Sequence, residues 1–329
     1  MEKEPFSSVL LGFRPGPNKG FSFFRICFMG LALVFGLSSK VSACTSFALY
    51  AGDIFFGMNF DYFAIPLKFL IESVSGMNVF HLSFLFEQTV DDPSYEGYFA
   101  KTCGMNSKGL FCASQEIEPH VQGRKKTHGN EVHIDDQYET LSGCSNVEQV
   151  KKKISPGQWV QYIGPSIHNM FADMNKKAMV TETDNQENFI TEIEDDIMVM
   201  SNFPNHSLVN RSHTQALGVG ADRYKTAYDY LMKNRTRFSV DKGFDLLSKV
   251  AMAQSDCSTL CSMVFHPRPN LVYVALDRDF DKIWKVSLNS KTIETCKGFD
   301  QSLKIGLGPG GILSADLKSF HKTGKTSGS

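Results

Sequence analysis

The chain has 329 residues, of which 42% are hydrophobic and 21% are charged, and its formal net charge is −1. This composition is that of an ordinary globular protein. The near-neutral charge argues against nucleic acid and against an anionic membrane surface as partners, because both select strongly basic chains.

The first 43 residues have the three-part layout of a secretory signal peptide. Lys19 and Arg25 precede the apolar run ICFMGLALVFGL, and SSKVSA follows with small residues just before Cys44. The apolar run is too short to span a bilayer comfortably. We therefore predict that residues 1–43 are removed by cleavage after Ala43, that the mature protein is exported to the periplasm or secreted, and that it has no stable membrane insertion. A buried N-terminal helix is the alternative interpretation.

Strand patterns begin directly after Cys44. The runs CTSFALY and DIFFGMNF flank Ala51-Gly52-Asp53, which is typical of a β-hairpin. The segment 77–87 predicts a further strand, and a turn at 106–109 precedes another. Residues 118–144 are polar, and we expect them to form an exposed irregular excursion.

The remaining pattern mixes helices with antiparallel strands. Ser145 and Glu148 have the spacing of a capping box, which predicts a helix through Lys153. Strand-like runs follow in SIHNMFADM, KAMVTE, NFITEIE and IMVMSNF, and apolar spacing predicts helices over 221–233 and 241–253. TLCSMVFHP, NLVYVALD and DKIWKVSL predict a closing meander. We expect an α+β domain over residues 44–320 and a disordered tail over 321–329.

Eight cysteines are present, and removal of the segment that contains Cys27 leaves seven. Seven is odd, so at least one thiol stays unpaired within the chain, while the connectivity of any disulfides remains open. Cys257 and Cys261 lack the second ligand pair that a zinc site needs. We expect neither a metal nor a cofactor.

Cleavage after Ala43 gives Cys44 unusual chemistry, because the residue then carries both a thiol and a free α-amine. The reference pKa values are about 8.5 for the thiol and about 7.7–8.0 for the amine, so the neutral amine can accept the thiol proton. Nucleophile and base then belong to one residue. A hairpin returns the chain beside its start, which places Asp61 near Cys44 to hold the amine. A strand-ending turn residue is the alternative for Asp61.

The segment CTSF…GMNFDY resembles the opening of the choloylglycine hydrolase and penicillin V acylase family of N-terminal-nucleophile (Ntn) hydrolases. CGMNSKGLFCAS, IHNMFADMNKKAMVTE, VMSNFP, GADRYKTA and STLCSMVFHPRPNLVYVAL resemble further segments of that family in the same order. The resemblance implies an αββα four-layer sandwich. It also implies hydrolysis of a small-molecule acyl amide, of the bile-salt-conjugate, penicillin V, or N-acyl amino acid or lactone type, and often a tetrameric homo-oligomer.

The same resemblance assigns roles to four residues. Cys44 would be the nucleophile and, through its amine, the base, and Asp61 would hold that amine. Asn202 would donate its side-chain amide to the tetrahedral oxyanion, and Arg223 would support the charges around the nucleophile. Without the resemblance, Asn202 would be a turn residue and Arg223 a residue on a helix surface.

Three weaker candidates concern the substrate. Met58 stands where the family has an arginine, which would favour the thiolate. Glu116 falls where the family has a second oxyanion-site Asn or Tyr, and a carboxylate there would repel an oxyanion. Phe63 belongs to a group of aromatic residues that crowd the hairpin, which core packing also explains.

Two rival functions stay open. Val41-Ser42-Ala43-Cys44 also fits a loose lipobox, in which a lipoprotein would be anchored at Cys44. Lipidation would consume the thiol and amine and is incompatible with catalysis. The second rival is a catalytically degenerate relative that only binds acyl amides, which Met58 and Glu116 would suit.

Overall fold

The structure is a computed structural model that describes residues 44–86, 98–118, 131–160, 166–184, 187–254 and 256–323. The expected signal peptide and residues 324–329 of the expected tail lie outside these ranges. Within them, no helix is both long and apolar enough to cross a membrane.

The described residues form two eight-stranded antiparallel sheets and a small parallel pair. The first sheet has the order β12 (Ile197–Met200), β1 (Thr45–Leu49), β2 (Phe55–Tyr62), β13 (Ser258–His266), β14 (Leu271–Leu276), β15 (Ile283–Ser287), β16 (Thr292–Lys297) and β17 (Lys304–Gly306). The second sheet has the order β11 (Glu187–Glu192), β10 (Ala178–Asp184), β9 (Ile167–Ala172), β6 (Phe111–Glu116), β5 (Tyr98–Asn106), β4 (Met77–Phe86), β3 (Leu67–Val74) and β18 (Ile312–Leu313). The pair consists of β7 (Glu131–His133) and β8 (Gln158–Val160).

Helices connect and cover these sheets. The α-helices are α1 (Val147–Ile154), α2 (Ala221–Asn234), α3 (Val240–Lys249) and α4 (Ser314–Thr323). Short 3₁₀ helices are η1 (Ile134–Ser142), η2 (Asn205–Leu208), η3 (His213–Gln215) and η4 (Arg235–Arg237).

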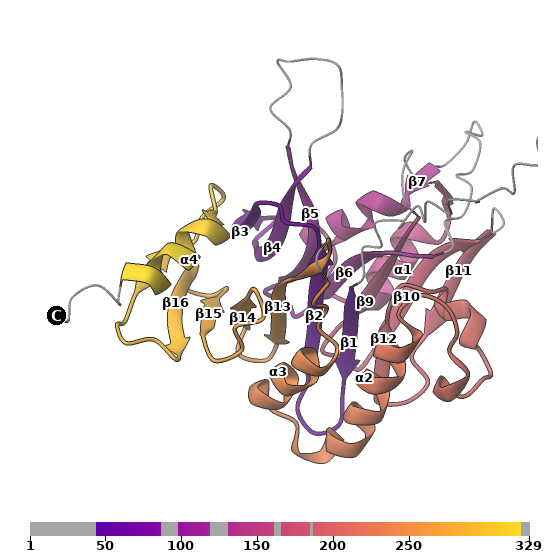
Figure 1. The fold of residues 1–329 in the computed structure, drawn as a ribbon. Coiled ribbons are helices and arrows are strands. Elements are labelled where there is room, and N and C mark those ends of the chain that lie inside the picture. Colours follow the sequence, from indigo (N-terminus) through magenta and orange to yellow (C-terminus); the bar gives the residue numbers. More distant parts are fainter. Residues whose placement is uncertain are drawn as a thin grey trace, which may run out of the picture. The chain divides into compact units, whose positions relative to one another are not determined.

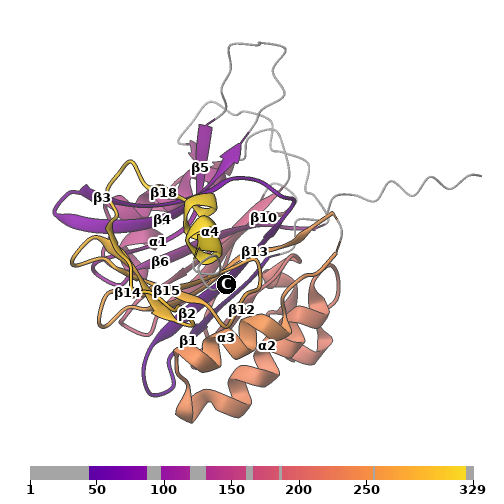
Figure 2. The same cartoon turned by 60° about the vertical axis from the view of Figure 1, so that its left-hand side comes forward.

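The two large sheets pack face to face, with helices on both outer sides. Side chains alternate between the faces of a strand, so Ala48 of β1 points into the core between the sheets while Phe47 and Leu49 point to the other side. That other side is covered by α2 and α3, which lie beside β1 and β2 in both views (Figure 1, Figure 2). The outer face of the second sheet is covered by η1 and α1. The layers are therefore αββα, which confirms the expected fold class.

The predicted hairpin sets the register at the start of the domain. Thr45 pairs with Asn59 and Leu49 with Phe55, and Gly52 takes a left-handed backbone with φ 86° in the turn. On the other side of β1, Ser46 pairs with Met200. Extending that register by two residues sets Asn202 opposite Cys44.

The sequence interpretation was wrong between residues 131 and 144, where a buried 3₁₀ helix replaces much of the expected exposed excursion. Ile134 and Leu141 of η1 are fully buried against the second sheet, and their polar neighbours obscured this spacing in the sequence. Residues 119–130 of the expected excursion lie outside the described ranges.

Smaller differences concern the ends of helices. The cap of α1 is Asn146, whose side chain accepts a hydrogen bond from the Gln149 N–H, so the capping residue lies one position after Ser145. Helix α3 ends at Lys249, before the expected Ala253, and α4 includes residues 321–323 of the expected tail.

Candidate active site

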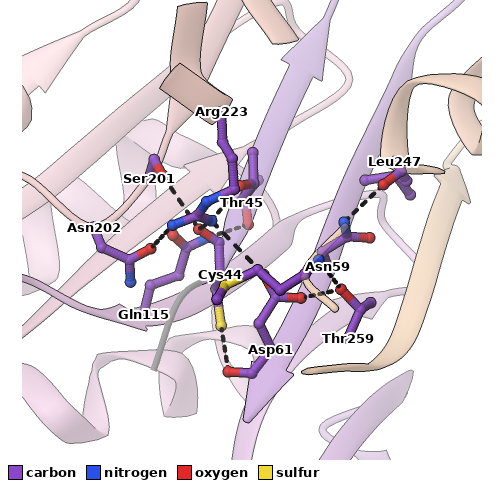
Figure 3. Close-up of polar contacts among 12 residues, drawn as sticks. Cys44, Thr45, Asn59, Asp61, Gln115, Ser201, Asn202, Arg223, Leu247 and Thr259 are labelled. Atoms are coloured by element: carbon purple, nitrogen blue, oxygen red, sulfur yellow. Dashed lines mark hydrogen bonds and ion pairs between the residues drawn. The ribbon is translucent and has the colours of Figure 1, made fainter. Parts of the chain in front are cut away.

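Cys44 lies at the start of β1, in the core between the two sheets. Only 2% of its surface is exposed, and its thiol donates a long hydrogen bond to the main-chain oxygen of Asp61, with 3.8 Å between Sγ and O (Figure 3). The register of the hairpin causes this proximity, because Asp61 lies two residues beyond the Asn59 that pairs with Thr45. The predicted pair of Cys44 and Asp61 is therefore brought together.

Arg223, in the first turn of α2, links the elements around Cys44 (Figure 3). Its Nη1 donates to the Cys44 carbonyl oxygen at 2.7 Å and to Thr45 Oγ1 at 2.8 Å. Its Nη2 donates to Asn202 Oδ1 at 2.8 Å, and Nη1 lies 3.7 Å from Asp61 Oδ2. One guanidinium therefore fixes the start of β1 at Cys44, the amide of Asn202 and the carboxylate of Asp61 relative to one another.

Gly220 makes this approach of Arg223 possible. It caps α2 with a left-handed backbone, φ 77°, and a Cβ at this position would collide with the Arg223 guanidinium and with Ser201 Oγ. A glycine is required here both for the backbone conformation and for the space.

Asp61 is fully buried, and Thr259 and Arg223 both contact its carboxylate. Thr259 Oγ1 donates to Asp61 Oδ1 at 2.5 Å, and Thr259 is placed by its pairing with Asp61 across β13 and β2. Burial raises the pKa of Asp61 to about 7, although the hydrogen bond from Thr259 and the charge of Arg223 both lower it. A cation placed beside this carboxyl would favour its ionised form.

Asn202 follows β12, and both ends of its side-chain amide are bound. Oδ1 accepts from Arg223, and Nδ2 donates to the main-chain oxygen of Glu116 at 2.8 Å. An amide nitrogen carries two hydrogens, so the Glu116 carbonyl uses one of them. The orientation of the Asn202 amide toward the Cys44 side of the site is thus determined by two neighbours.

The thiol of Cys44 is held in its protonated form in the full-length chain. Burial raises its pKa well above the usual range, and the charges of Asp61 and Glu116 raise it further, while Arg223 lowers it less. In this chain the nitrogen of Cys44 belongs to the peptide bond with Ala43. The full-length chain therefore holds a protonated thiol at Cys44 with no free α-amine on the same residue.

The three weaker candidates take different positions. Met58 is fully buried in the core between the sheets, paired with Ser46. Phe63 is 42% exposed, and its ring centroid lies 4.1 Å from that of Tyr62. Glu116 ends β6 at the site itself, where burial raises its pKa to about 7 and its charge raises the pKa of Tyr62.

The sequence did not single out Thr259, nor the buried polar pair of Ser46 and Gln115. Gln115 Nε2 donates to Ser46 Oγ at 2.5 Å, which joins β6 of the second sheet to β1 of the first. The sequence predicts the closing strand that contains Thr259, but it does not show that this strand pairs with β2 and so places Thr259 beside Asp61.

Within the described ranges, no group of three or more His, Cys, Asp or Glu side chains could hold a metal ion. The described cysteines form no disulfide with one another. The groups around the Cys44 thiol are a buried carboxylate, an oriented amide and a guanidinium, a combination that can support acyl transfer.

Comparisons with known proteins agree with this geometry at the level of the fold. No family model matches the chain, and no curated protein matches it in sequence. Among solved structures, a variant of conjugated bile acid hydrolase from Clostridium perfringens is similar, with TM-score 0.59, 19% identity, and coverage of 80% of this chain and 99% of that chain. A second mutant of that protein gives TM-score 0.57 at the same identity and coverage. Penicillin V acylase from Agrobacterium tumefaciens gives TM-score 0.53 and 13% identity, covering 77% of this chain and 91% of that chain. The chain has the fold of these proteins, as the sequence resemblance implied.

Proposed function

We propose that this chain is a hydrolase of the choloylglycine hydrolase and penicillin V acylase family, which cleaves the linear amide bond of an N-acyl compound with Cys44 as its N-terminal nucleophile. The observation that carries the proposal is the contact of one buried guanidinium, that of Arg223, with the Cys44 carbonyl, the Asn202 amide and the Asp61 carboxylate. The similarity of fold to a bile acid hydrolase and a penicillin acylase supports the same reaction class.

The reaction begins when removal of residues 1–43 turns the peptide nitrogen of Cys44 into an amine. The amine accepts the thiol proton, and the thiolate attacks the amide carbonyl, which forms a C–S bond and an oxyanion. The ammonium then gives its proton to the departing nitrogen as the C–N bond breaks. Water attacks the resulting thioester and gives a proton to the amine as the C–O bond forms. The C–S bond then breaks, the ammonium returns that proton to the sulfur, and the carboxylic acid is released.

Each neighbour of Cys44 has a role that its contacts allow. Asp61 stabilises the ammonium form of the amine, and this charge in turn favours the ionised carboxylate. Asn202 offers an N–H to the oxyanion, and removing such a donor typically lowers kcat by about 10²–10³-fold. Arg223 touches neither substrate nor thiol in this scheme; it orients Asn202 and the Cys44 main chain.

The lipoprotein alternative fits the position of Cys44 poorly. A lipid anchor needs a cysteine on an accessible tether, whereas Cys44 is 2% exposed and β1 begins at the next residue. The binding-only alternative differs from the enzyme in chemistry alone, and the assay below separates the two.

The charges around Cys44 favour a substrate whose departing amine is neutral or cationic. Asp61 and Glu116 both act on the Cys44 thiol as negative charges, and Glu118 acts in the same way on Glu116. Glu118 is close by, because its N–H donates to the Asn202 carbonyl at 2.8 Å. Arg223 is the cation that opposes them. Glycine-, taurine- or penicillin-type leaving groups carry an anion that this field repels.

We expect the protein that begins at Cys44 to release amine from N-acyl amides. The assay uses one acyl group joined to ethanolamine, to a diamine, or to glycine, which make the departing amine neutral, cationic or anionic. Free amine should appear from the first two and much less from the third. If neither the wild type nor Glu116→Gln releases amine from any of these substrates, at several acyl lengths, the binding-only alternative is favoured.

Glu116→Gln should change selectivity rather than overall activity. Loss of the carboxylate should raise kcat/KM for the glycine amide relative to the ethanolamine amide by roughly tenfold at pH 8, the effect expected from one nearby like charge. The pKa of Glu116 is about 7, so the wild-type preference for the neutral substrate should grow as the pH rises through 7. Ionisation of Cys44 affects kcat/KM for both substrates equally, so it cancels in the ratio of the two values. Equal ratios in both proteins across this range would exclude the proposed role of Glu116.

A further inference from the structure

A buried carboxylate outside the site holds the loop that follows β12. Glu182 of β10 is fully buried, and four nitrogens, two from the main chain and two from histidine rings, lie within hydrogen-bonding distance of its carboxylate. Its Oε2 accepts from the Asn205 main chain at 3.0 Å and lies 3.4 Å from His168 Nδ1. Its Oε1 accepts from the His206 main chain at 2.5 Å and lies 2.9 Å from His206 Nδ1.

This carboxylate keeps its charge. Burial alone would raise the pKa of Glu182, but hydrogen bonds from the side chains of His168 and His206 hold it at about 2. A buried carboxylate is strongly unfavourable unless its oxygens are paired, and here both oxygens are. The pairing is therefore an obligatory contact between the second sheet and the loop.

The loop held by Glu182 is the one that carries Asn202. Asn202 lies three residues before Asn205, and the Asn205 side chain donates to the Val199 carbonyl at 3.0 Å, which closes the loop onto its own strand. At the start of the loop, the side-chain amide of Asn202 is bound by Arg223 and by the Glu116 carbonyl. The segment between these two attachments is short, so a shift at Asn205 is transmitted to Asn202.

We infer that Glu182 is a positioning residue for the reaction: by holding the main chain of Asn205 and His206, it sets where the Asn202 amide meets the oxyanion. The inference rests on the proposed function of Asn202. Glu182 belongs to the second sheet and Asn202 follows the edge strand of the first, so this contact also fixes the two sheets relative to each other beside the site. A misplacement of about 1 Å is enough to lower a catalytic rate by about 10²-fold.

A double-mutant cycle separates positioning from a general effect on the fold. Glu182→Gln turns one acceptor into a donor that faces the loop N–H groups, and we expect kcat to fall about 10- to 100-fold with KM changed less than threefold. In an Asn202→Ala background the same substitution should change kcat less than twofold, because the donor that it displaces is already gone. A fall of equal size in both backgrounds would overturn the inference.

Asp184→Asn is the matched control. Asp184 lies on the same strand, and its carboxylate lies 3.3 Å from Nε2, the outer nitrogen of His206. Among the described residues, that carboxylate makes no hydrogen bond with the main chain of the loop. We expect its kcat to stay within twofold of the wild type. A fall as large as that of Glu182→Gln would assign the effect to His206 and not to the held main chain.

Hydrogen exchange tests the inference without any substrate. The amides of Asn205 and His206 should exchange at least tenfold faster in Glu182→Gln, while those of β1 stay unchanged. Unchanged exchange at the loop would contradict the inference even if the proposed reaction were established. If the protein hydrolysed no amide, faster exchange would still show that Glu182 holds the loop main chain, and only the proposed function would fail. If Glu182→Gln does not fold, His206→Gln removes one of the four contacts from the partly exposed side, and a smaller acceleration is expected.

Discussion

Cys44→Ala should lower the rate of amide hydrolysis by on the order of 10⁴-fold or more in the protein that begins at residue 44. In the proposed mechanism the substitution removes the atom that forms the covalent intermediate, and losses of this size follow removal of a nucleophile in other hydrolases. Release of free amine, followed at saturating substrate, measures the effect. Cys44→Ser keeps the shape of the residue and should also be nearly inactive, because a hydroxyl is a far weaker acid than a thiol.

Cys112→Ala is the control for losing a buried thiol. Cys112 is fully buried on the outer face of the second sheet, away from Arg223 and Asp61. Its activity should stay within about threefold of the wild type, with a modest loss of stability from the cavity. Residual activity of more than one part in a hundred in Cys44→Ala would remove Cys44 from the role of nucleophile.

Arg223→Met should lower kcat by about 10²–10³-fold and also destabilise the fold. The catalytic loss follows because the Asn202 amide loses the partner that orients it, at the scale of losing one oxyanion donor. The loss of stability, about 3–5 kcal/mol at high pH, follows because the buried Asp61 carboxylate loses its ion pair with Arg223. Arg223→Lys should recover little, because an ammonium cannot donate to the Cys44 carbonyl and to the Asn202 amide from a fixed fork.

The loss of stability in Arg223→Met should depend on pH, in a direction set by the pKa of Asp61. The pKa of Asp61 is raised to about 7 in the fold, from an ordinary value of 3.8, so ionising it opposes folding as the pH rises. Without Arg223 that pKa rises further. Urea unfolding should therefore show a small difference between wild type and Arg223→Met at pH 4 and a large one at pH 8.

Arg235→Met is the matched control for this experiment. Arg235 lies just beyond the other end of the same helix and is exposed. Both its activity and its stability should equal those of the wild type. Wild-type kcat in Arg223→Met, or a difference in stability that does not grow with pH, would contradict the role given to this guanidinium.

The local part of the site was predictable because the hairpin determines it. Pairing between β1 and β2 requires only neighbouring strands and a Gly-containing turn, and it brings Asp61 beside Cys44. Asn202 and Arg223 both lie more than 150 residues after Cys44 in the chain. Their convergence on Cys44 depends on the pairing of β12 with β1 and on the start of α2, and only the resemblance to a known family pointed to them.

The parts that sequence reasoning missed depend on long-range pairing. Thr259 reaches Asp61 across a separation of 198 residues, and Glu182 reaches its loop from the opposite sheet. Such contacts leave no periodic pattern of apolar residues in the neighbouring sequence. Glu116 shows a different limit. The family resemblance points to the side chain at this position, whereas Asn202 binds the main-chain oxygen, which any residue could supply.

Mass spectrometry of two forms of the protein, with the adduct located by peptide mapping, would show whether the amine of Cys44 is the base. One form begins at Cys44, and the other keeps Ala43, which preserves the thiol and all its neighbours but ties the nitrogen into a peptide bond. Each is mixed with an N-acyl ethanolamide and quenched in acid within seconds. We expect a thioester adduct of the acyl mass on the peptide that contains Cys44 in the first form, and none in the second. Equal acylation of both forms, or a diacylglyceryl adduct on Cys44 in the protein isolated from its host, would contradict the proposed mechanism.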